Sequence, residues 1–134
     1  MNTQKLKFVV LQIVKPRISL DTALEDMKEV ESLVDTYGGE VLDRSIQHRS
    51  DPNPGTYIGQ GKIEWLKEVV KERKIDVIVL NDIVKSGQLF RLEQELWEVN
   101  RRIIVWDRVG LILAIFDQHA KTREAKLQIE LARI

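Results

Sequence analysis

Apolar positions along the chain follow two kinds of spacing. Residues 6–14 (LKFVVLQIV) and 76–80 (DVIVL) are short, nearly uninterrupted apolar runs rich in β-branched side chains. Such runs are typical of strands that are covered on both faces. Residues 40–47 and 102–106 predict two further strands, and the first of these is polar enough to be expected at an edge of the sheet.

Between these runs, apolar residues recur at helical spacing. Residues 20–37 carry one such stripe, and Gly38-Gly39 is expected to end that helix. Asp21 or Thr22 is expected to cap its start, with Thr22 and Glu25 forming a capping box. A second helix should follow Lys62, and a third should begin near Ser86, which is expected to cap it.

The alternation of strands and helices predicts an α/β fold. Connections of this length favour a four-stranded parallel sheet, in the order 2-1-3-4, flanked by helices. Residues 1–107 are expected to form this α/β subdomain, and residues 108–134 a C-terminal helical segment. In that segment Leu127, Leu131 and Ile134 share one face. No Gly, Asn or Pro punctuates its end, so we expect the helix to continue in a longer protein.

Composition narrows the classes of function. The chain has 134 residues, 43% hydrophobic and 31% charged, which fits one globular domain. Lys plus Arg and Asp plus Glu both total 21, so any contact with nucleic acid would depend on local patches. Cysteine is absent and histidine occurs twice, so no disulfide and no metal site is expected. No apolar run approaches the ~20 residues of a membrane span and no signal peptide is recognisable, so a cytoplasmic location is expected.

Gly59-Gln60-Gly61-Lys62, a glycine-rich turn just before the second helix, is the first candidate site. Backbone N–H groups at the start of a helix, together with Lys62, can hold a phosphate of a nucleotide or of RNA. The alternative is a tight turn in which both glycines take positive φ and Lys62 is solvated.

Basic side chains give two further candidates. Arg44, His48 and Arg49 lie near the end of the second strand, and Arg123 and Lys126 share one face of the last helix. Each group either contacts RNA phosphates or forms an ordinary solvated surface. No residue is expected to be catalytic.

Asp82, Asp107 and Arg108 should lie at the carboxyl ends of the third and fourth strands, where α/β folds often bind ligands. Paired carboxylates there could serve acid–base chemistry. We favour a structural role instead, in which Asp107 caps the next helix and Arg108 pairs locally.

Three segments in register resemble the HflX family of GTPases. Residues 57–64 (YIGQGKIE) resemble its signature YIGxGKxEE, residues 107–116 (DRVGLILAIF) its DRTGLILDIF, and residues 122–132 (TREAKLQIELA) its TREAKLQVELAQL. The proline-containing loop at residues 51–54 is also similar. The resemblance covers nearly the whole chain.

The resemblance implies an N-terminal α/β subdomain followed by the start of a helical hairpin, at residues 108–134. It implies binding to the large ribosomal subunit and its rRNA, and regulation of a GTPase domain in the same protein. GTP and Mg²⁺ would belong to that domain, because the present sequence has no G-x-x-x-x-G-K-[ST] motif. We therefore expect no cofactor and no catalysis on this chain alone, although the resembled family is a GTPase.

The chain departs from the family pattern at several positions. Val109 replaces Thr, Ala114 replaces Asp, and Asp117 and His119 replace Ala and Arg. The loop at residues 81–87 also differs from the DDELSPSQ that is usual in the family. Any role that depends on the Thr hydroxyl, the Asp carboxylate or the Arg charge of the family pattern is therefore not expected in this chain.

Three functional hypotheses follow. The leading one is a ribosome-binding module, and its main rival is a domain that binds or hydrolyses ATP or GTP through the Gly59–Lys62 turn. The rival lacks the Ser or Thr that should follow Lys62. An interaction module that works through the last helix is the third, and the apolar face of that helix also predicts a homodimer. A signalling receiver is rejected, because Val14-Lys15-Pro16 stands where it needs acidic residues.

Overall fold

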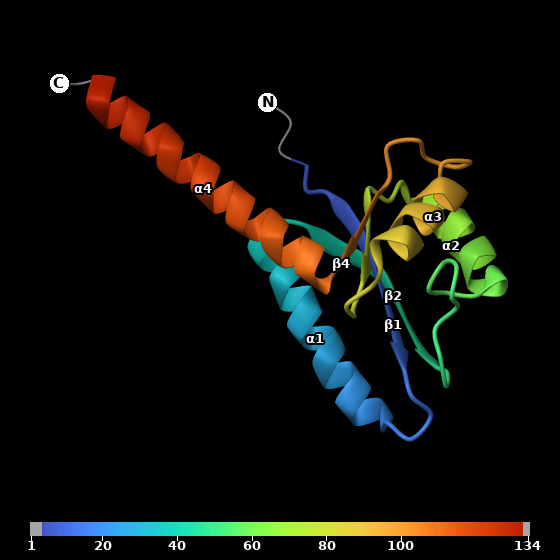
Figure 1. The fold of residues 1–134 in the computed structure, drawn as a ribbon. Helices are drawn as coiled ribbons and strands as arrows, with labels where there is room; N and C mark the ends of the chain where they lie inside the picture. Colours follow the sequence, from blue (N-terminus) through green and yellow to red (C-terminus); the bar gives the residue numbers. More distant parts are fainter. Residues whose placement is uncertain (1–3, 133–134) are drawn as a thin grey trace.

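The computed structural model describes residues 4–132, with side chains as far as residue 128. Strands and helices alternate along the chain, and the last helix projects away from the rest (Figure 1). The elements are β1 (Lys7–Val14), α1 (Leu20–Tyr37), β2 (Glu40–His48), α2 (Gln60–Arg73), β3 (Val77–Leu80), α3 (Ser86–Leu96), β4 (Ile104–Asp107) and α4 (Arg108–Ala132).

The four strands form one parallel sheet in the order β2-β1-β3-β4, which confirms the predicted fold class and strand order. β1 is central, and its residues 8–11 are at most 1% exposed. The predicted strand at 102–106 begins too early, since β4 starts at Ile104. The backbone N–H of Arg102 bonds to Asn100 Oδ1 at 2.9 Å in the preceding turn, which keeps it out of the ladder.

Each face of the sheet has its own apolar core because successive strand residues point to opposite faces. Val9 and Leu11 of β1 pack with buried residues of α2 and α3, whereas Phe8 and Val10 pack with buried residues of α1 and α4. In Figure 1, α1 and α4 accordingly lie on one side of the sheet, with α2 and α3 on the other.

The start of α1 differs from the sequence prediction. Ser19, not Asp21 or Thr22, is the N-cap, and its hydroxyl accepts a hydrogen bond from the backbone N–H of Thr22 at 3.1 Å. Thr22 and Glu25 therefore form no capping box. The end is as predicted: Gly38 takes φ 99°, and Gly39 leaves room for the ring of Phe8.

The start of α3 also corrects a prediction. Ser86 is the first residue of the helix rather than its cap, which is Lys85. The backbone N–H of Lys85 donates to Gln88 Oε1 at 3.3 Å, so a side chain of the first turn bonds back to the cap residue.

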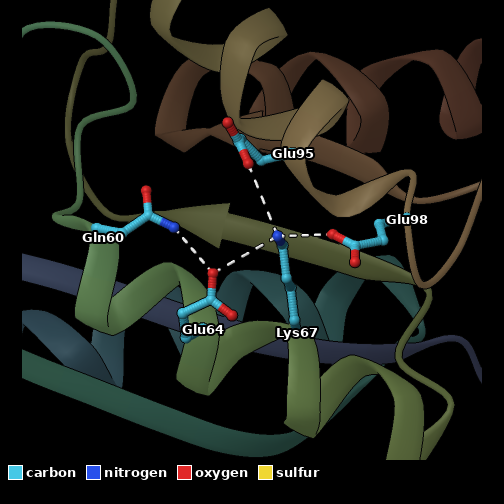
Figure 2. A network of polar contacts seen from close by, with 5 residues as sticks. All are labelled: Gln60, Glu64, Lys67, Glu95 and Glu98. Atoms are coloured by element: carbon cyan, nitrogen blue, oxygen red, sulfur yellow. Dashed lines mark hydrogen bonds and ion pairs between the residues drawn. The ribbon is translucent and has the colours of Figure 1, made fainter.

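Lys67 connects α2 to α3 (Figure 2). Its Nζ lies 2.8 Å from Glu98 Oε2 and 3.7 Å from Glu95 Oε2, both near the end of α3. It also lies 3.6 Å from Glu64 Oε1 on its own helix, and that oxygen accepts a hydrogen bond from Gln60 Nε2 at 2.8 Å. The network therefore reaches the first residue of α2.

The C-terminal segment is one continuous helix that follows β4 directly. Leu111 and Ile115 are buried against the sheet, and Gln118 Nε2 donates to the carbonyl of Tyr37 at the end of α1, at 3.1 Å. Beyond this point α4 leaves the sheet (Figure 1), and Leu127 is 57% exposed. The side chains of Ile129, Glu130, Leu131 and Ala132, and residues Arg133 and Ile134, lie outside the described residues. The homodimer therefore stays a prediction.

Among residues 4–132, no helix is both long and apolar enough to cross a membrane.

Candidate functional site

Tyr57 fills the edge of the sheet at the point where strand order reverses, between the carboxyl ends of β1 and β3. It is 2% exposed and adopts φ 69°. Two backbone hydrogen bonds of 2.9 Å tie it to Asn53. Its hydroxyl donates to Asp82 Oδ2 at 3.1 Å. In open α/β sheets this position is the usual ligand crevice, but here a side chain of the chain itself occupies it.

The loop before Tyr57 is held by its own polar groups. Asn53 Oδ1 accepts hydrogen bonds from the backbone N–H of Gly55 at 2.8 Å and of Thr56 at 3.1 Å. Gln88 Nε2 donates to the carbonyl of Asn53 at 2.9 Å, which fixes the loop to the first turn of α3. Tyr57 is therefore positioned from several sides.

The two edge carboxylates have structural roles. Asp107 is 7% exposed, and its oxygens accept from the backbone N–H of Gly110 at 2.8 Å and of Val84 at 3.1 Å. This confirms that Asp107 caps the following helix. Burial raises the pKa of the Tyr57 hydroxyl well above its ordinary value, and the negative charge of Asp82 raises it further. Asp82 accepts a hydrogen bond from that hydroxyl and also one from the backbone N–H of Ile83, at 2.7 Å, so each of the two carboxylates bonds to groups of the chain itself.

The expectation that Arg108 pairs locally is wrong. Its Nη2 lies 3.0 Å from Glu29 Oε2 on α1, 79 residues away in the sequence. The residue therefore links the start of α4 to α1. Asp82, Asp107 and Arg108 all bond to groups of the chain itself, in line with the structural role favoured from the sequence.

The helix predicted to follow Lys62 begins earlier: α2 starts at Gln60, so Gly61 and Lys62 lie in its first turn and Gly59 and Gly61 do not take positive φ. Gly59 is the N-cap in extended conformation, φ −77°, and among described residues only Gly38, Tyr57 and Lys74 have positive φ. No side chain caps α2 and no acidic residue lies in its first turn. A Cβ added at Gly61 would meet open space, so its backbone can be approached closely from outside.

The structure brings Arg49 to this helix start. Its Nη1 lies 3.3 Å from the position that a Cβ on Gly59 would occupy. Lys62, by contrast, lies over the ring of Trp65 on its own helix, with Nζ 4.6 Å from the ring centroid. The N-terminus of a helix carries partial positive charge, so a cation beside it is electrostatically unfavourable. An anion bound between the two would remove that repulsion.

The other predicted basic residues are dispersed. His48 Nε2 lies 3.0 Å from the carbonyl oxygen of Ile18, in the turn after β1. Arg44 points to the α1 face, where it pairs with Glu31. Arg123 and Lys126 are exposed on the projecting part of α4. This part extends beyond the end of α1, whereas Arg49 lies at the carboxyl ends of the strands. The eight candidates therefore do not form one site.

Sequence reasoning missed three polar residues at the same edge: Lys15, Arg17 and Ser50, which directly follows Arg49. Together with Pro16 they line a shallow pocket of about 340 Å³. The available signal was the run Lys15-Pro16-Arg17 directly after a buried strand. We name Lys15, Arg17, His48, Arg49, Ser50, Gly59, Gly61 and Lys62 the carboxyl-edge surface.

A GTP–Mg²⁺ site does not fit these residues. Within residues 4–132 no group of three or more His, Cys, Asp or Glu side chains is placed to hold a metal ion. Ile63, not Ser or Thr, follows Lys62. The donor set at this edge suits a phosphate group, but the described residues form no cluster of metal ligands there.

Comparison with known proteins gives consistent matches. Residues 24–117 match the family described as GTP-binding GTPase N-terminal. The GTPase HflX of Escherichia coli is 40% identical over 114 residues, which are 85% of this chain and 26% of that protein. The GTPase HflX of Thermococcus kodakarensis is 42% identical over 106 residues, or 79% and 23% of the two chains.

A solved structure shares the fold. The crystal structure of a GTP-binding protein from the hyperthermophilic archaeon Sulfolobus solfataricus, in complex with GDP, matches with a TM-score of 0.63 and 27% identity. The match covers 96% of this chain and 36% of that one. The chain thus spans about a quarter of the length of the curated relatives described above.

Proposed function

We propose a function from the premise that this chain belongs to the HflX family of GTPases, as its N-terminal domain. The proposed function is docking on the large ribosomal subunit, by contact of the carboxyl-edge surface with rRNA phosphates. Such a role places the protein in the cytoplasm. It also makes the domain a partner of the GTPase domain that full-length relatives carry, whose activity the docked domain would regulate.

The supporting observation is a difference in how basic residues are neutralised. Arg44, Lys67 and Arg108 each lie within 4.0 Å of a carboxylate oxygen. Within the described part of the chain, Lys15, Arg17, Arg49 and Lys62 have no such neighbour. Arg49 and Lys62 lie at the uncapped start of α2, and Lys15 and Arg17 line a pocket with Ser50. Unpaired cations are the groups that bind nucleic-acid phosphates, because binding releases the counterions held by the nucleic acid.

GTP and Mg²⁺ are assigned to the GTPase domain of the relatives and not to this chain. Any nucleotide dependence of docking would then have to reach the carboxyl-edge surface through contact between the two domains. The crystal structure of the relative from S. solfataricus contains GDP.

Co-sedimentation with purified large ribosomal subunits tests the proposal. We expect the fraction of protein that pellets to fall as salt concentration rises, because phosphate contacts are salt-dependent. The double substitution Arg49→Glu/Lys62→Glu should abolish pelleting at moderate salt. A matched control, Lys28→Glu/Lys71→Glu, makes the same change in net charge at exposed sites on α1 and α2 and should pellet like wild type. Pelleting that is absent for wild type, or lost equally in the control, contradicts the proposal.

The alternative function is binding or hydrolysis of ATP or GTP at the Gly59–Lys62 helix start. The unpaired Arg49 beside Gly59 favours an anion there. The absence of a hydroxyl residue after Lys62 and of a metal-ligand cluster in residues 4–132 argues against it. Nucleotide turnover by this chain that is lost in Lys62→Ala would reverse the ranking of the two functions.

A further inference from the structure

The turn that follows β1 is held rigidly at the edge of the sheet. The backbone N–H of Ile18 donates to the carbonyl of Lys15 at 3.0 Å, so residues 15–18 form a closed turn with Pro16 at its second position. Proline fixes φ at the value this position requires. His48 Nε2 lies 3.0 Å from the carbonyl oxygen of Ile18, which ties the turn to the end of β2.

The pairing of β1 with β2 places Ser50 opposite this turn. The backbone N–H of Arg49 donates to the carbonyl of Val14 at 2.9 Å, which continues the ladder one residue beyond β2. Ser50 follows directly, and it lines the pocket of about 340 Å³ with Lys15, Pro16 and Arg17. Residues that are far apart in the sequence thus meet in one concave surface.

The charges of the pocket are uncompensated. Of the four lining residues, two are cations and one carries a hydroxyl, and none is acidic. Among residues 4–132, no carboxylate oxygen lies within 4.0 Å of Lys15 Nζ or of the Arg17 guanidinium. Two other pockets differ in this respect, because acidic side chains line them beside the basic ones. Glu25 and Glu31 line one pocket with Lys28 and Arg44, and Glu95 and Glu98 line another with Arg91.

We propose that the Lys15–Arg17–Ser50 pocket binds one phosphate group, through the two cations and the serine hydroxyl. Guanidinium and ammonium groups give charge-assisted hydrogen bonds to phosphate, and a hydroxyl adds a neutral donor. The phosphate comes either from an RNA backbone or from a free nucleotide. For the first source the inference rests on the proposed RNA contact and extends it by a defined subsite, whereas the second source would be independent of it.

Titration of the full chain with inorganic pyrophosphate tests the pocket without any ribosome. We expect pyrophosphate to shift the amide NMR signals of Lys15, Arg17, Ile18 and Ser50. In Lys15→Ala/Arg17→Ala the affinity should fall by about tenfold or more, because two charge-assisted bonds are lost. Ser50→Ala should cause a smaller loss, and Lys28→Ala/Lys71→Ala, which removes the same charge elsewhere, should bind like wild type. All substituted side chains are exposed, so the fold should be retained.

A salt series with a single-stranded RNA oligonucleotide distinguishes the two sources. If the phosphate is part of RNA, the double alanine variant should reduce the slope of log affinity against log salt by about 0.7 relative to the control pair. An unchanged slope, with pyrophosphate affinity still dependent on Lys15 and Arg17, assigns the pocket to a free nucleotide or phosphate. Pyrophosphate affinity that is equal in wild type, the pocket variant and the control overturns the inference.

The two proposals fail in different experiments. Large ribosomal subunits that do not bind the wild-type chain, combined with pyrophosphate shifts confined to the pocket, would refute the docking function and leave the phosphate pocket standing. Ribosome binding that is unaffected by Lys15→Ala/Arg17→Ala, with no pyrophosphate shifts, would refute the pocket and leave docking standing.

Discussion

The hydroxyl of Tyr57 donates a 3.1 Å hydrogen bond to Asp82 Oδ2, across 25 residues of sequence. Tyr57 is also one of two described non-glycine residues with positive φ. Left-handed backbone costs a residue with a Cβ about 1–2 kcal/mol, and such strain persists only where the surroundings fix it. The hydrogen bonds to Asn53 and Asp82 fix the backbone of Tyr57 in this conformation. They hold the tyrosine at a position where many α/β folds have an open crevice.

Tyr57→Phe should therefore destabilise the domain without changing its shape. Removal of the hydroxyl leaves Asp82 Oδ2 without this donor and should lower the free energy of unfolding by about 1–2 kcal/mol. Urea denaturation measures the change, with an m-value equal to that of wild type. Tyr37→Phe is the matched control, expected within about 0.5 kcal/mol, because no hydrogen bond to the Tyr37 hydroxyl is found in the described structure. Equal losses in both variants would contradict the role given to Asp82.

The raised pKa of Tyr57 predicts a dependence of stability on pH. Burial is the largest cause of the raised pKa, followed by the charge of Asp82. Because the folded-state pKa lies above the unfolded value, the stabilisation is complete below about pH 10. It is lost as pH rises further, since the unfolded chain ionises first.

Urea midpoints of wild type and Tyr57→Phe at about pH 8, pH 10 and pH 11 test this dependence. Wild type should lose stability above about pH 10 by up to about 1.4 kcal/mol per pH unit more than the variant does. Parallel curves for the two proteins would show that Tyr57 ionises equally in the folded and unfolded states.

The strand order was predictable because burial on both faces leaves a signal in the sequence. Residues 8–11 are uniformly apolar since β1 is central, whereas β2 is more polar because it lies at the edge. The caps were less predictable. Ser19, Thr22 and Asp21 are all good cap residues, and the choice among them depends on where the turn after β1 ends.

The sequence predicts only in part that the candidate basic residues lie at different places on the surface. Arg44 and Arg49 are five positions apart on or beside one strand, so period-two alternation alone places them on opposite faces. The meeting of Arg49 with Gly59, and of Arg17 with Ser50, depends on strand pairing and loop paths. No local pattern in one sequence encodes such contacts.

Gly61→Ala separates a structural role of that glycine from a binding role. The added Cβ meets open space, and alanine is a better helix residue by about 0.8–1 kcal/mol, so the variant should be slightly more stable. If phosphate approaches the backbone there, co-sedimentation with large ribosomal subunits should nevertheless weaken. A more stable variant with unchanged binding would remove Gly61 from the carboxyl-edge surface.

Gly39→Ala is the contrasting case. An added Cβ would lie 2.6 Å from Phe8 Cδ1, inside the core. Overpacking of this kind should lower the free energy of unfolding by about 1–3 kcal/mol. Thermal or urea denaturation measures the loss, and a variant as stable as wild type would show that the ring of Phe8 can move aside at little cost.

The Lys67 network predicts a pH-dependent link between α2 and α3. The hydrogen bond from Lys67 lowers the pKa of Glu98, and that same bond raises the pKa of Lys67. A lowered carboxyl pKa stabilises the fold above its unfolded value of about 4.3, and this contribution is lost as pH falls. A raised lysine pKa stabilises the fold below about pH 10.4 and is lost as pH rises.

Glu98→Gln should therefore lower the urea midpoint at neutral pH and have little effect near about pH 3. The neutral-pH effect should shrink in high salt, because Glu98 is exposed. Glu68→Gln on the outer face of α2 is the control, since no ion pair involves Glu68 in the described structure. An effect of Glu98→Gln that is the same at both pH values would rule out the ionic contribution.

Leu111 and Ile115, in the first turns of α4, pack in the same apolar core as residues of β1 and β3, while the boundary between residues 107 and 108 stays a prediction. Leu111 is 0% exposed and Leu113, two residues further along the same helix, is 61% exposed. Leu111→Ala should lower the free energy of unfolding by about 2–5 kcal/mol, and Leu113→Ala should change it by about 0.5 kcal/mol at most. Urea denaturation followed by tryptophan fluorescence measures both, and Trp106, which belongs to the same core, reports directly on this region. If both variants were as stable as wild type, α4 would pack on the sheet without contributing to its stability, and residues 1–107 would be the folding unit.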